Sequence, residues 1–596
     1  METLTARWLR VARADDVLRS GRLAVHLDGH AVALFASDGH IYAVDNRCPH
    51  MGFPLDRGSV ADGILTCHWH HARFDLAGGG TFDQFADDVR SYPVEIRGDD
   101  VYVDLAPRGD PRAHHRRRLR DGLERDIPLV VAKAALALGA DDTGAVEAVR
   151  VGLDFGTRYR AAGWGPGLTI LTCYANLLPY LDDADRPWAL YQGLSAVARD
   201  TTGAAPRFVL APLPDEAAGV DRLTAWFRRF VEVRDAEGAE RCIVSAVREG
   251  ADAAALARML FAAATDHRYI QTGHVLDFTN KAFEALEIAG WDHAETALAS
   301  LATGYAAAAR MEESNQWRHP VDLVAIVEAA ADALPGVLET GRRRGNGEAA
   351  AAPAPAAAQR PAGGDRTELI SVLLGEDPHA IAQVLLEALR RGSAPADVAA
   401  HVVYAAALRI ARFPQSNEFG DWDTALHTFT FANAVHQGLR RSGSTLLVRG
   451  IFDAAMSVYL DRFLNVPPAR LPDPDREAPA GPDLLAGLAG ALDRQQQVAP
   501  AARLVATYLS GKNEAAPLVA TLGRLLVRED RNFHTIQMLE AGVRQHAALR
   551  RTEAGAHMLV AAARYLAAHA PTVRAQGQTF EIARRLHRGE RLFEEE

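Results

Sequence analysis

Cysteine is scarce in this sequence, with four residues among 596, and two of them, Cys173 and Cys242, stand alone. A disulfide framework needs many paired cysteines, so that class is excluded and a reducing, cytoplasmic location is predicted. A basic excess is also absent, because the net charge is −11, which argues against a general nucleic-acid binder. The longest apolar run, at 129–140, is too short to span a membrane, and the first residues lack a signal peptide's apolar core. No membrane association is therefore expected.

The sequence changes in character near residue 106, after a series of short β-rich runs. These runs are separated by the turn dipeptides Asp28-Gly29 and Asp38-Gly39, and a last pair flanks Gly98-Asp99. Asp-Gly between alternating apolar runs is a strong signal for a β-hairpin. The pattern predicts a small antiparallel all-β domain over residues 1–106.

The rest of the chain is rich in Ala, Leu, Arg and Glu and carries long segments of 3.6-residue periodicity, which predict helices. The fold class is therefore multidomain, with a small all-β domain followed by a large all-α region. Low-complexity Ala/Pro/Gly sequence divides that region and predicts a flexible linker. The predicted segments are a basic linker with a first helical turn at 107–120, a first helical half at 121–339, the flexible linker at 340–366 and a second helical half at 367–596.

Two segments of the helical region share the pattern His-x-x-x-Phe-x-Asn. They are HVLDFTN, which starts at His274, and HTFTFAN, which starts at His427. A third segment, HTIQMLE from His534, keeps the histidine and an apolar residue four places later. Either a degenerate helical repeat or similar packing of unrelated helices accounts for this pattern, and both interpretations stay open.

The strongest chemical signal is the pair CPH, from Cys48 to His50, and CHWH, from Cys67 to His70. A Rieske [2Fe-2S] cluster binds one iron through two thiolates and the other through two imidazoles. Two loops that each supply one sulfur and one nitrogen provide that set. Zinc also accepts two cysteines and two histidines, but zinc fingers pair Cys with Cys and His with His. The mixed pairing inside a β domain therefore favours the Rieske cluster.

From end to end, residues 5–106 resemble the small Rieske ferredoxins that feed bacterial dioxygenases, including the CPHMG box and the C-x-x-H-x-x-x-F-D box. The resemblance implies four cluster ligands: the thiolates of Cys48 and Cys67 and the imidazoles of His50 and His70. His68 stands where the family often has Pro, and His71 where it commonly has Gly. Both are therefore expected to be non-ligands near the exposed edge of the cluster.

The resemblance also predicts the reduction potential. High-potential Rieske proteins join the two loops by a disulfide and hydrogen-bond the cluster sulfurs through a Ser and a Tyr. The corresponding positions here are Phe53, Trp69, Ala72 and Phe74, which supply neither feature. Because hydrogen bonds to the sulfurs favour the reduced cluster, we expect a potential at the low end of the range, about −150 mV. A measured potential above about +100 mV would contradict this expectation.

The helical region lacks clear sequence motifs for three kinds of redox cofactor site. A Rieske oxygenase α-subunit needs Asp-x-x-His-x-x-x-x-His for its mononuclear iron, and this spacing does not occur after residue 106. A di-iron bundle needs Glu-x-x-His on two helices, and the one instance, Glu376 to His379, contains Pro378 and predicts a helix cap. No Gly-x-Gly-x-x-Gly follows a strand, so we expect no flavin or nicotinamide site and a separate reductase as electron donor.

A segment from Asp266 to Phe278, DHRYIQTGHVLDF, resembles the His-aromatic-Ile-Gln-x-Gly segment of questin oxidase-like proteins. These are helical proteins associated with oxidative ring cleavage of an anthraquinone. The segment at His427 is a looser match, and the family's tandem His-His has only a poor counterpart in His114-His115. The resemblance implies an oxygenase acting on an aromatic or polyketide-like small molecule.

The same resemblance predicts that four histidines converge inside the helical region, as ligands of a second metal or as groups that move protons: His267, His274, His427 and His534. The alternative is that they are buried histidines that cap or bridge helices through hydrogen bonds. Asp266 and Asp277 are expected to orient them. Two interpretations of the whole chain follow. One is an oxidoreductase with a Rieske electron-input domain fused to a helical oxygenase. The other is a non-catalytic Rieske ferredoxin on a helical interaction scaffold that serves a separate oxygenase.

Overall fold

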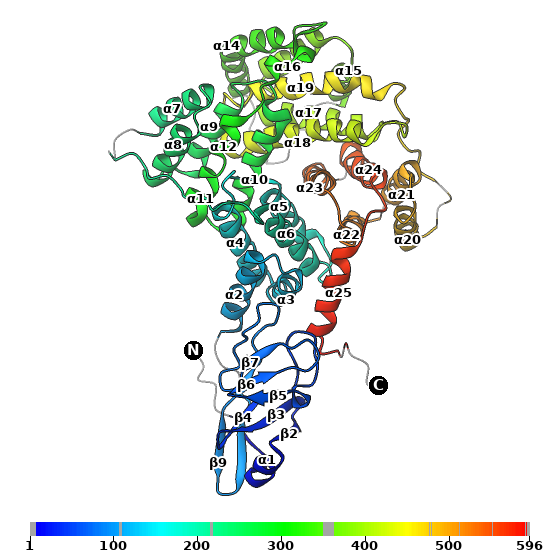
Figure 1. The fold of residues 1–596 in the computed structure, drawn as a ribbon. Helices are drawn as coiled ribbons and strands as arrows, with labels where there is room; N and C mark the ends of the chain where they lie inside the picture. The colour runs from blue at the N-terminus through cyan, green and yellow to red at the C-terminus, as the bar shows by residue number, and fades with distance from the viewer. Residues whose placement is uncertain are drawn as a thin grey trace. The chain divides into compact units, whose positions relative to one another are not determined.

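The computed structural model describes residues 7–106, 110–214, 219–349, 363–475, 477, 479–511, 513–550, 552–590 and 592 (Figure 1). Two compact units make up the chain. One comprises Met1–Val151 and Ala575–Glu596, and the other comprises Gly152–Arg574. The predicted flexible linker at 340–366 falls partly on 350–362, which lies outside the described residues.

The first unit begins with the predicted antiparallel β domain, whose strands form three small sheets. One sheet has the order β1-β10-β9, the second β2-β3-β4-β8 and the third β5-β6-β7. Its strands are β1 (Trp8–Arg13), β2 (Arg22–Leu27), β3 (His30–Ser37), β4 (His40–Asp45), β5 (Ser59–Ala61), β6 (Ile64–Thr66), β7 (Arg73–Asp75), β8 (Ser91–Tyr92), β9 (Val94–Arg97) and β10 (Asp100–Asp104).

Asp-Gly turns join the hairpins, as the sequence predicts. Leu27 pairs with His30 across the first turn, where Asp28 and Gly29 both have positive φ, 45° and 83°. Such a turn matches the twist of the two strands it connects. A further Asp-Gly turn, at 62–63, joins β5 to β6 and so fixes the hairpin that leads to the second Cys/His motif.

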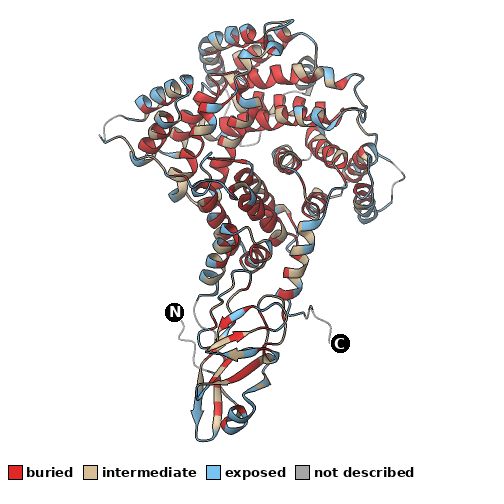
Figure 2. Cartoon of the chain, in the orientation of Figure 1, coloured by how far each residue is buried: buried red, intermediate tan, exposed pale blue. Residues whose placement is uncertain are grey.

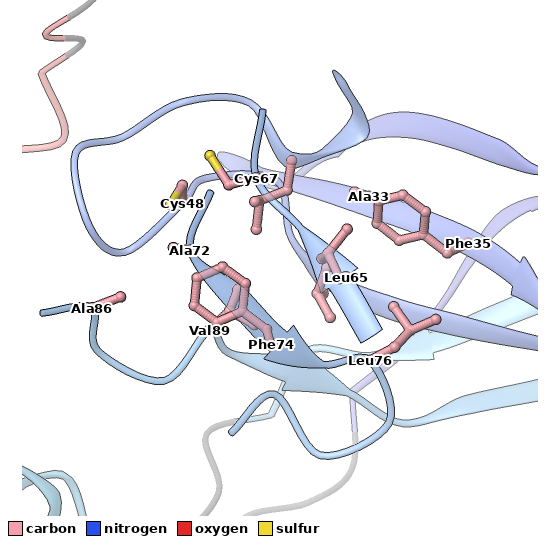
Figure 3. Close-up of a cluster of buried hydrophobic side chains, with 12 residues drawn as sticks. Ala33, Phe35, Cys48, Leu65, Cys67, Ala72, Phe74, Leu76, Ala86 and Val89 are labelled. Atoms are coloured by element: carbon pink, nitrogen blue, oxygen red, sulfur yellow. The ribbon is translucent and has the colours of Figure 1, made fainter. Parts of the chain in front are cut away.

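Two hydrophobic clusters fill the β domain. One contains Val32, Leu34 and Val101, and the other contains Phe35, Leu65 and Phe74. Cys48 and Cys67 both belong to the second cluster, at one end of it (Figure 3). The apolar side chains under the two cysteines therefore keep water away from one side of the sulfurs.

Helices complete the first unit: α1 (Ala14–Ser20), α2 (Pro111–Glu124), α3 (Pro128–Leu138) and α25 (Ala575–His587). α2 covers most of the stretch predicted as a basic linker. It starts at Pro111 because Asp110 caps it, accepting a hydrogen bond from the backbone N–H of Arg112. The C-terminal helix α25 packs against α3, so the two ends of the chain lie in one unit.

The second unit is helical, as predicted. Helix α4 contains the boundary between the units. The helices are α4 (Asp142–Arg158), α5 (Pro166–Leu177), α6 (Arg186–Thr201), α7 (Val220–Glu232), α8 (Ala236–Arg248), α9 (Ala253–Ala264), α10 (His274–Ala289), α11 (Ala294–Ala299), α12 (Ala302–Ala307), α13 (Asn315–Arg318), α14 (Leu323–Ala349), α15 (Gly363–Leu373), α16 (Pro378–Arg390), α17 (Pro395–Ala411), α18 (Phe419–Ser442), α19 (Arg449–Leu460), α20 (Gly481–Leu492), α21 (Val498–Ser510), α22 (Ala515–Val527), α23 (Phe533–Ala548) and α24 (Glu553–Ala568).

Four of these helices form the centre of the second unit. α10 packs against α5 and α18, and α23 packs against the same two helices. All four are buried along most of their length (Figure 2). Among the described residues, no helix is both long enough and apolar enough to cross a lipid bilayer. Polar residues on these four helices are therefore held deep inside a protein core, where each needs a partner.

Candidate functional sites

The two Cys/His loops have the same backbone hydrogen-bond pattern. The N–H of Cys48 donates to the carbonyl of Phe53 at 2.7 Å, and the N–H of Gly52 donates to the carbonyl of Cys48 at 2.8 Å. In the second loop, the Cys67 N–H donates to Ala72 at 2.8 Å, and the His71 N–H donates to Cys67 at 3.0 Å. Each cysteine therefore opens a turn of the same length, although the sequence motifs differ in spacing.

The residue four places after each cysteine has a left-handed backbone. Gly52 has φ +85° and His71 has φ +60°. Glycine adopts this conformation without cost, whereas a side chain there is strained. The turn therefore gives a physical reason for the glycine expected at the position of His71 in related sequences.

The side chains of the two loops converge. The Cys48 sulfur accepts hydrogen bonds from the backbone N–H groups of His50 and Met51, and the Cys67 sulfur from those of Trp69 and His70. The two sulfurs lie next to each other (Figure 3), and the imidazole rings of His50 and His70 are 4.9 Å apart between centroids. Two thiols and two imidazoles thus face one small volume.

The protonation of these groups suits ligands. Burial lowers the pKa of His50 to about 4, with His70 and Lys133 adding to the effect, so its ring is neutral at pH 7. The hydrogen bond between the sulfurs lowers the pKa of Cys67 to about 6 and raises that of Cys48. The Nδ1 atom of His50 is buried without a hydrogen-bond partner in the described part of the chain. With the ring of His70 beside it, this neutral, unpartnered nitrogen and the two thiols make up the two-sulfur, two-imidazole donor set of a Rieske cluster.

Comparisons with known proteins decide the family. Residues 7–93 match the family model of the Rieske [2Fe-2S] domain. The ferredoxin component of the naphthalene 1,2-dioxygenase system of Pseudomonas putida is 30% identical over 104 residues, which are 17% of this chain and 100% of that protein. Through this domain, the chain belongs to the Rieske [2Fe-2S] family. The Rieske domain therefore holds a [2Fe-2S] cluster.

Further relatives of the Rieske domain are of the same kind. The ferredoxin component of the p-cumate 2,3-dioxygenase system of Pseudomonas putida is 34% identical over 94 residues, which cover 15% of this chain and 80% of that protein. The solved ferredoxin of carbazole 1,9a-dioxygenase from Nocardioides aromaticivorans IC177 is 29% identical, with a TM-score of 0.16, over 17% of this chain and 98% of that chain.

Apolar groups surround the cluster loops of the Rieske domain on the inner side. Ala72 and Phe74 are buried, and Phe53 and Trp69 pack against the same hydrophobic cluster. On the outer side, His68, His70 and His71 are exposed. The Rieske domain thus presents His70 to solvent, while His50 is half-buried.

In the helical unit, three of the four predicted histidines meet. His274 is the first residue of α10, His427 lies on α18 and His534 is the second residue of α23. One ring nitrogen of each lies within 4.8 Å of those of the other two, and the Nε2 atoms of His427 and His534 are 3.0 Å apart. Two nitrogen ligands bound to one metal at about 2.1 Å and at right angles lie about 3 Å apart, so this spacing fits a shared ion.

The fourth predicted histidine, His267, does not join them. Its Nδ1 bonds Glu312 at 2.7 Å and its Nε2 faces Glu232 at 3.2 Å, so both ring nitrogens are engaged. Asp266, predicted to orient a histidine, instead pairs with Arg228 and Arg449. Both residues contact partners other than the three histidines because the chain turns between them and His274.

Asp423 is the orienting carboxylate that the sequence analysis missed. It lies one turn before His427 on α18, faces Nδ1 of His534 at 3.3 Å and accepts a hydrogen bond from the hydroxyl of Tyr565. Metal-binding histidines commonly donate their second ring nitrogen to a carboxylate, which fixes the ring. The spacing Asp-x-x-x-His from Asp423 to His427 was the available signal.

Burial keeps the rings of His274 and His427 neutral. It lowers the pKa of His274 to about 4, helped by His534, and that of His427 to about 3, helped by both neighbours. All three side chains stay partly accessible, so a bound ion has room for further ligands. Three imidazole nitrogens and an open side form an arrangement used for catalytic metals.

A strained segment sets the position of His274. Tyr269, Gln271 and Thr272 have positive φ values of 41°, 52° and 50°, and Gly273 follows with φ +91°. A Cβ atom on Gly273 would lie 2.9 Å from the Cβ of Phe431, so no other residue fits. Strained backbone of this kind costs about 1–3 kcal/mol per residue and persists where the surroundings impose it. Here the strained segment at 269–273 places His274 at the first position of α10.

Polar pairs between α10 and α23 lead away from the three histidines. One turn beyond His274 and His534, the side chains of Asp277 and Gln537 share a hydrogen bond. One turn further, Lys281 forms an ion pair with Glu540. Their arrangement is a buried polar series that starts at the histidines.

The series ends in a balanced group of charges. Glu284 accepts from Lys281 at 2.9 Å and from Asn176 at 2.7 Å, and Arg544 lies 3.0 Å from Glu540. Asn176, Glu540 and Arg544 also line a cavity of about 320 Å³. Two cations and two carboxylates cancel, which leaves Asp277 without a counter-charge.

Asp277 is consequently a weak acid. Burial raises its pKa to about 7, although Lys281 lowers it, and its Oδ1 has no hydrogen-bond partner among the described residues. A carboxyl group that titrates near neutrality, one turn from three imidazoles, suits proton transfer.

Proposed function

We propose that Cys48 and Cys67 bind one iron of the [2Fe-2S] cluster through their sulfurs, and that His50 and His70 bind the other through their imidazoles. The converging side chains of the two matched turns support this set. The cluster supplies one-electron transfer when bound. The exposed ring of His70 gives electrons a path into the domain from a separate reductase, as in systems that use Rieske ferredoxins.

We infer further that the helical unit is an oxygenase with a second iron, held by His274, His427 and His534, and that it acts on an aromatic small molecule. The convergence of three histidines from three helices carries this proposal. Imidazole donors suit iron, copper, nickel and zinc, and iron is the choice that can use electrons from a Rieske cluster. We place the protein in the cytoplasm, where its thiols stay reduced.

The chain's own residues have distinct tasks in this reaction. Asp423 holds the ring of His534 with Nε2 turned towards His427. The accessible side of the three histidines admits the substrate. Asp277 takes up or releases a proton at its free Oδ1, and the ion pairs behind it carry no net charge that would oppose this transfer.

Metal analysis of the purified full-length protein tests the proposal. We expect one metal ion beyond the two cluster irons, and its loss in His427→Ala with the cluster intact. His436→Asn is the matched control, because His436 lies on the same helix but bonds Gln545. Iron at cluster stoichiometry alone in the wild-type protein would refute the second metal.

A non-catalytic Rieske protein on a helical scaffold is the second candidate. The observation that favours it is that the cavities described in the helical unit, of about 280, 320 and 450 Å³, are lined by residues other than the three histidines. Full loss of the second metal without any effect on oxygen consumption would support this alternative.

A further inference from the structure

The loop that carries Cys48 and His50 is held by helices that lie outside the family match. Lys133, on α3, donates from Nζ to the backbone carbonyl of His50 at 3.0 Å and to that of Pro49. From α25, Leu586 packs against Gly52, and Arg47 donates to the carbonyl of Glu590 at 2.8 Å. The matched region ends at residue 93, so these contacts are additions to the Rieske domain.

Lys133 is fixed in place by a second set of contacts. Asp87 lies 3.4 Å from its Nζ and 2.8 Å from the Nε atom of Arg118, which comes from α2. Arg118 is buried and also donates to the carbonyls of Gln84 and Ala86. Helix α3 therefore holds the loop of the candidate ligand His50 through Lys133, and α2 holds the segment at 84–87 through Arg118.

This arrangement leaves a positive charge at the ligand loop. Asp87 lies between Lys133 and Arg118, and Arg118 is also paired with Asp121 at 2.9 Å, so the four charges balance and the positive charge in contact with the ligand loop is that of Lys133. Burial lowers the pKa of Lys133 while Asp87 opposes the shift, and Lys133 and Arg118 outweigh burial to hold the pKa of Asp87 below its usual value. The nearest polar atoms to the ammonium group are two carbonyl oxygens of the loop and the Asp87 carboxylate.

A cation at this position favours the reduced cluster. One-electron reduction adds one negative charge to the cluster, and a positive charge in a buried setting stabilises that state more than the oxidised one. Carbonyls that point to Lys133 are also fixed in direction, so the loop has little freedom to reorganise when the charge changes. The electrostatic effect is larger here than at the surface because only 15% of the Lys133 side chain is exposed.

We propose that Lys133 is a built-in counter-charge for the reduced cluster, supplied by the helical part of the chain to the Rieske loop. It binds no iron and touches no substrate. It acts through the loop carbonyls and through space, and so raises the reduction potential above the value that the cluster loops alone would set.

The test is the reduction potential of the full-length protein with its cluster, measured by spectroelectrochemistry. Lys133→Met should lower the equilibrium constant for reduction at least tenfold, which is 59 mV for a one-electron couple. Lys133→Arg should restore most of the wild-type value, because it keeps the charge. Arg19→Gln on α1 is the control, since Arg19 has 78% of its side chain exposed and its loss should leave the potential unchanged.

Asp87→Asn provides an independent arm if Lys133→Met takes up no cluster. Removal of the negative charge should raise the potential, and an unchanged or lower potential would overturn the proposal. An unchanged potential in Lys133→Met, or an equal fall in Lys133→Met and Lys133→Arg, would overturn it as well. The electron paramagnetic resonance signal of the reduced cluster should keep its shape in all variants, because no ligand changes.

Discussion

In the Rieske domain, the candidate ligands come from two turns with the same backbone, and the histidines of each turn lie close to a cysteine in the sequence. In the helical unit, three histidines meet from three helices, and His427 and His534 are 107 residues apart. The first arrangement is imposed by local hydrogen bonds and the second by the packing of long helices. The site in the Rieske domain therefore tolerates little change in its two turns, whereas the three-histidine site depends on how distant helices pack.

Replacement of a cluster ligand should have the largest effect and should separate the two sites. Cys67→Ser removes a sulfur ligand, so we expect complete loss of the cluster's visible absorption and of its two irons. The metal at the three histidines should remain, because its ligands belong to the other unit. Metal analysis and absorption spectra check both outcomes, and parallel loss of all metals would contradict the independence of the sites.

Asp423→Asn should have the next largest effect, confined to the helical unit. The amide can still fill the space but holds the ring of His534 less firmly, so affinity for the second metal should fall about 10- to 100-fold. Competition with a chelator measures this affinity. The cluster spectrum serves as the internal control, and an unchanged affinity would show that Asp423 does not orient the ligand.

The pH dependence of stability should distinguish the helical core from the Rieske domain. Asp277 is protonated in the folded state up to about pH 7 but ionised in the unfolded chain above about pH 4. The folded state therefore binds more protons in this window, and stability falls as pH rises from about 4 to about 7. In Asp277→Asn, this part of the decline should vanish. Thermal unfolding of the helical unit at a series of pH values, with wild type minus variant as the quantity compared, tests the sign.

A change at His71 should have the smallest effect and should act on the Rieske domain alone. A residue with a side chain and φ +60° destabilises the fold by about 1–2 kcal/mol. Glycine removes this strain, but its greater freedom in the unfolded chain lowers stability by about 1 kcal/mol. His71→Gly should therefore stabilise the domain by about 0.5 kcal/mol. The midpoint of thermal cluster loss measures it. His68→Gly is the control and should stabilise nothing, because His68 lacks a positive φ.

Sequence patterns predicted the β domain, its Asp-Gly hairpins and the helical class of the remainder, because each depends on short-range spacing. They also selected His274, His427 and His534, which meet in the second unit. The resemblance grouped His267 with them, but Gln271 and Thr272 interrupt the helical backbone between His267 and His274. The sequence did not predict the roles of Lys133 and Asp423, because these roles arise only from contacts between distant segments.

The return of α25 to the Rieske loops has a consequence for biosynthesis. A ribosome that adds about 5–20 residues per second needs roughly half a minute to two minutes between the loop of Cys48 and α25. During that interval the β domain can fold, but Gly52 lacks Leu586 and Arg47 lacks its carbonyl partner. The loop of Cys48 therefore acquires these two contacts only at the end of synthesis, after the rest of the β domain has been made.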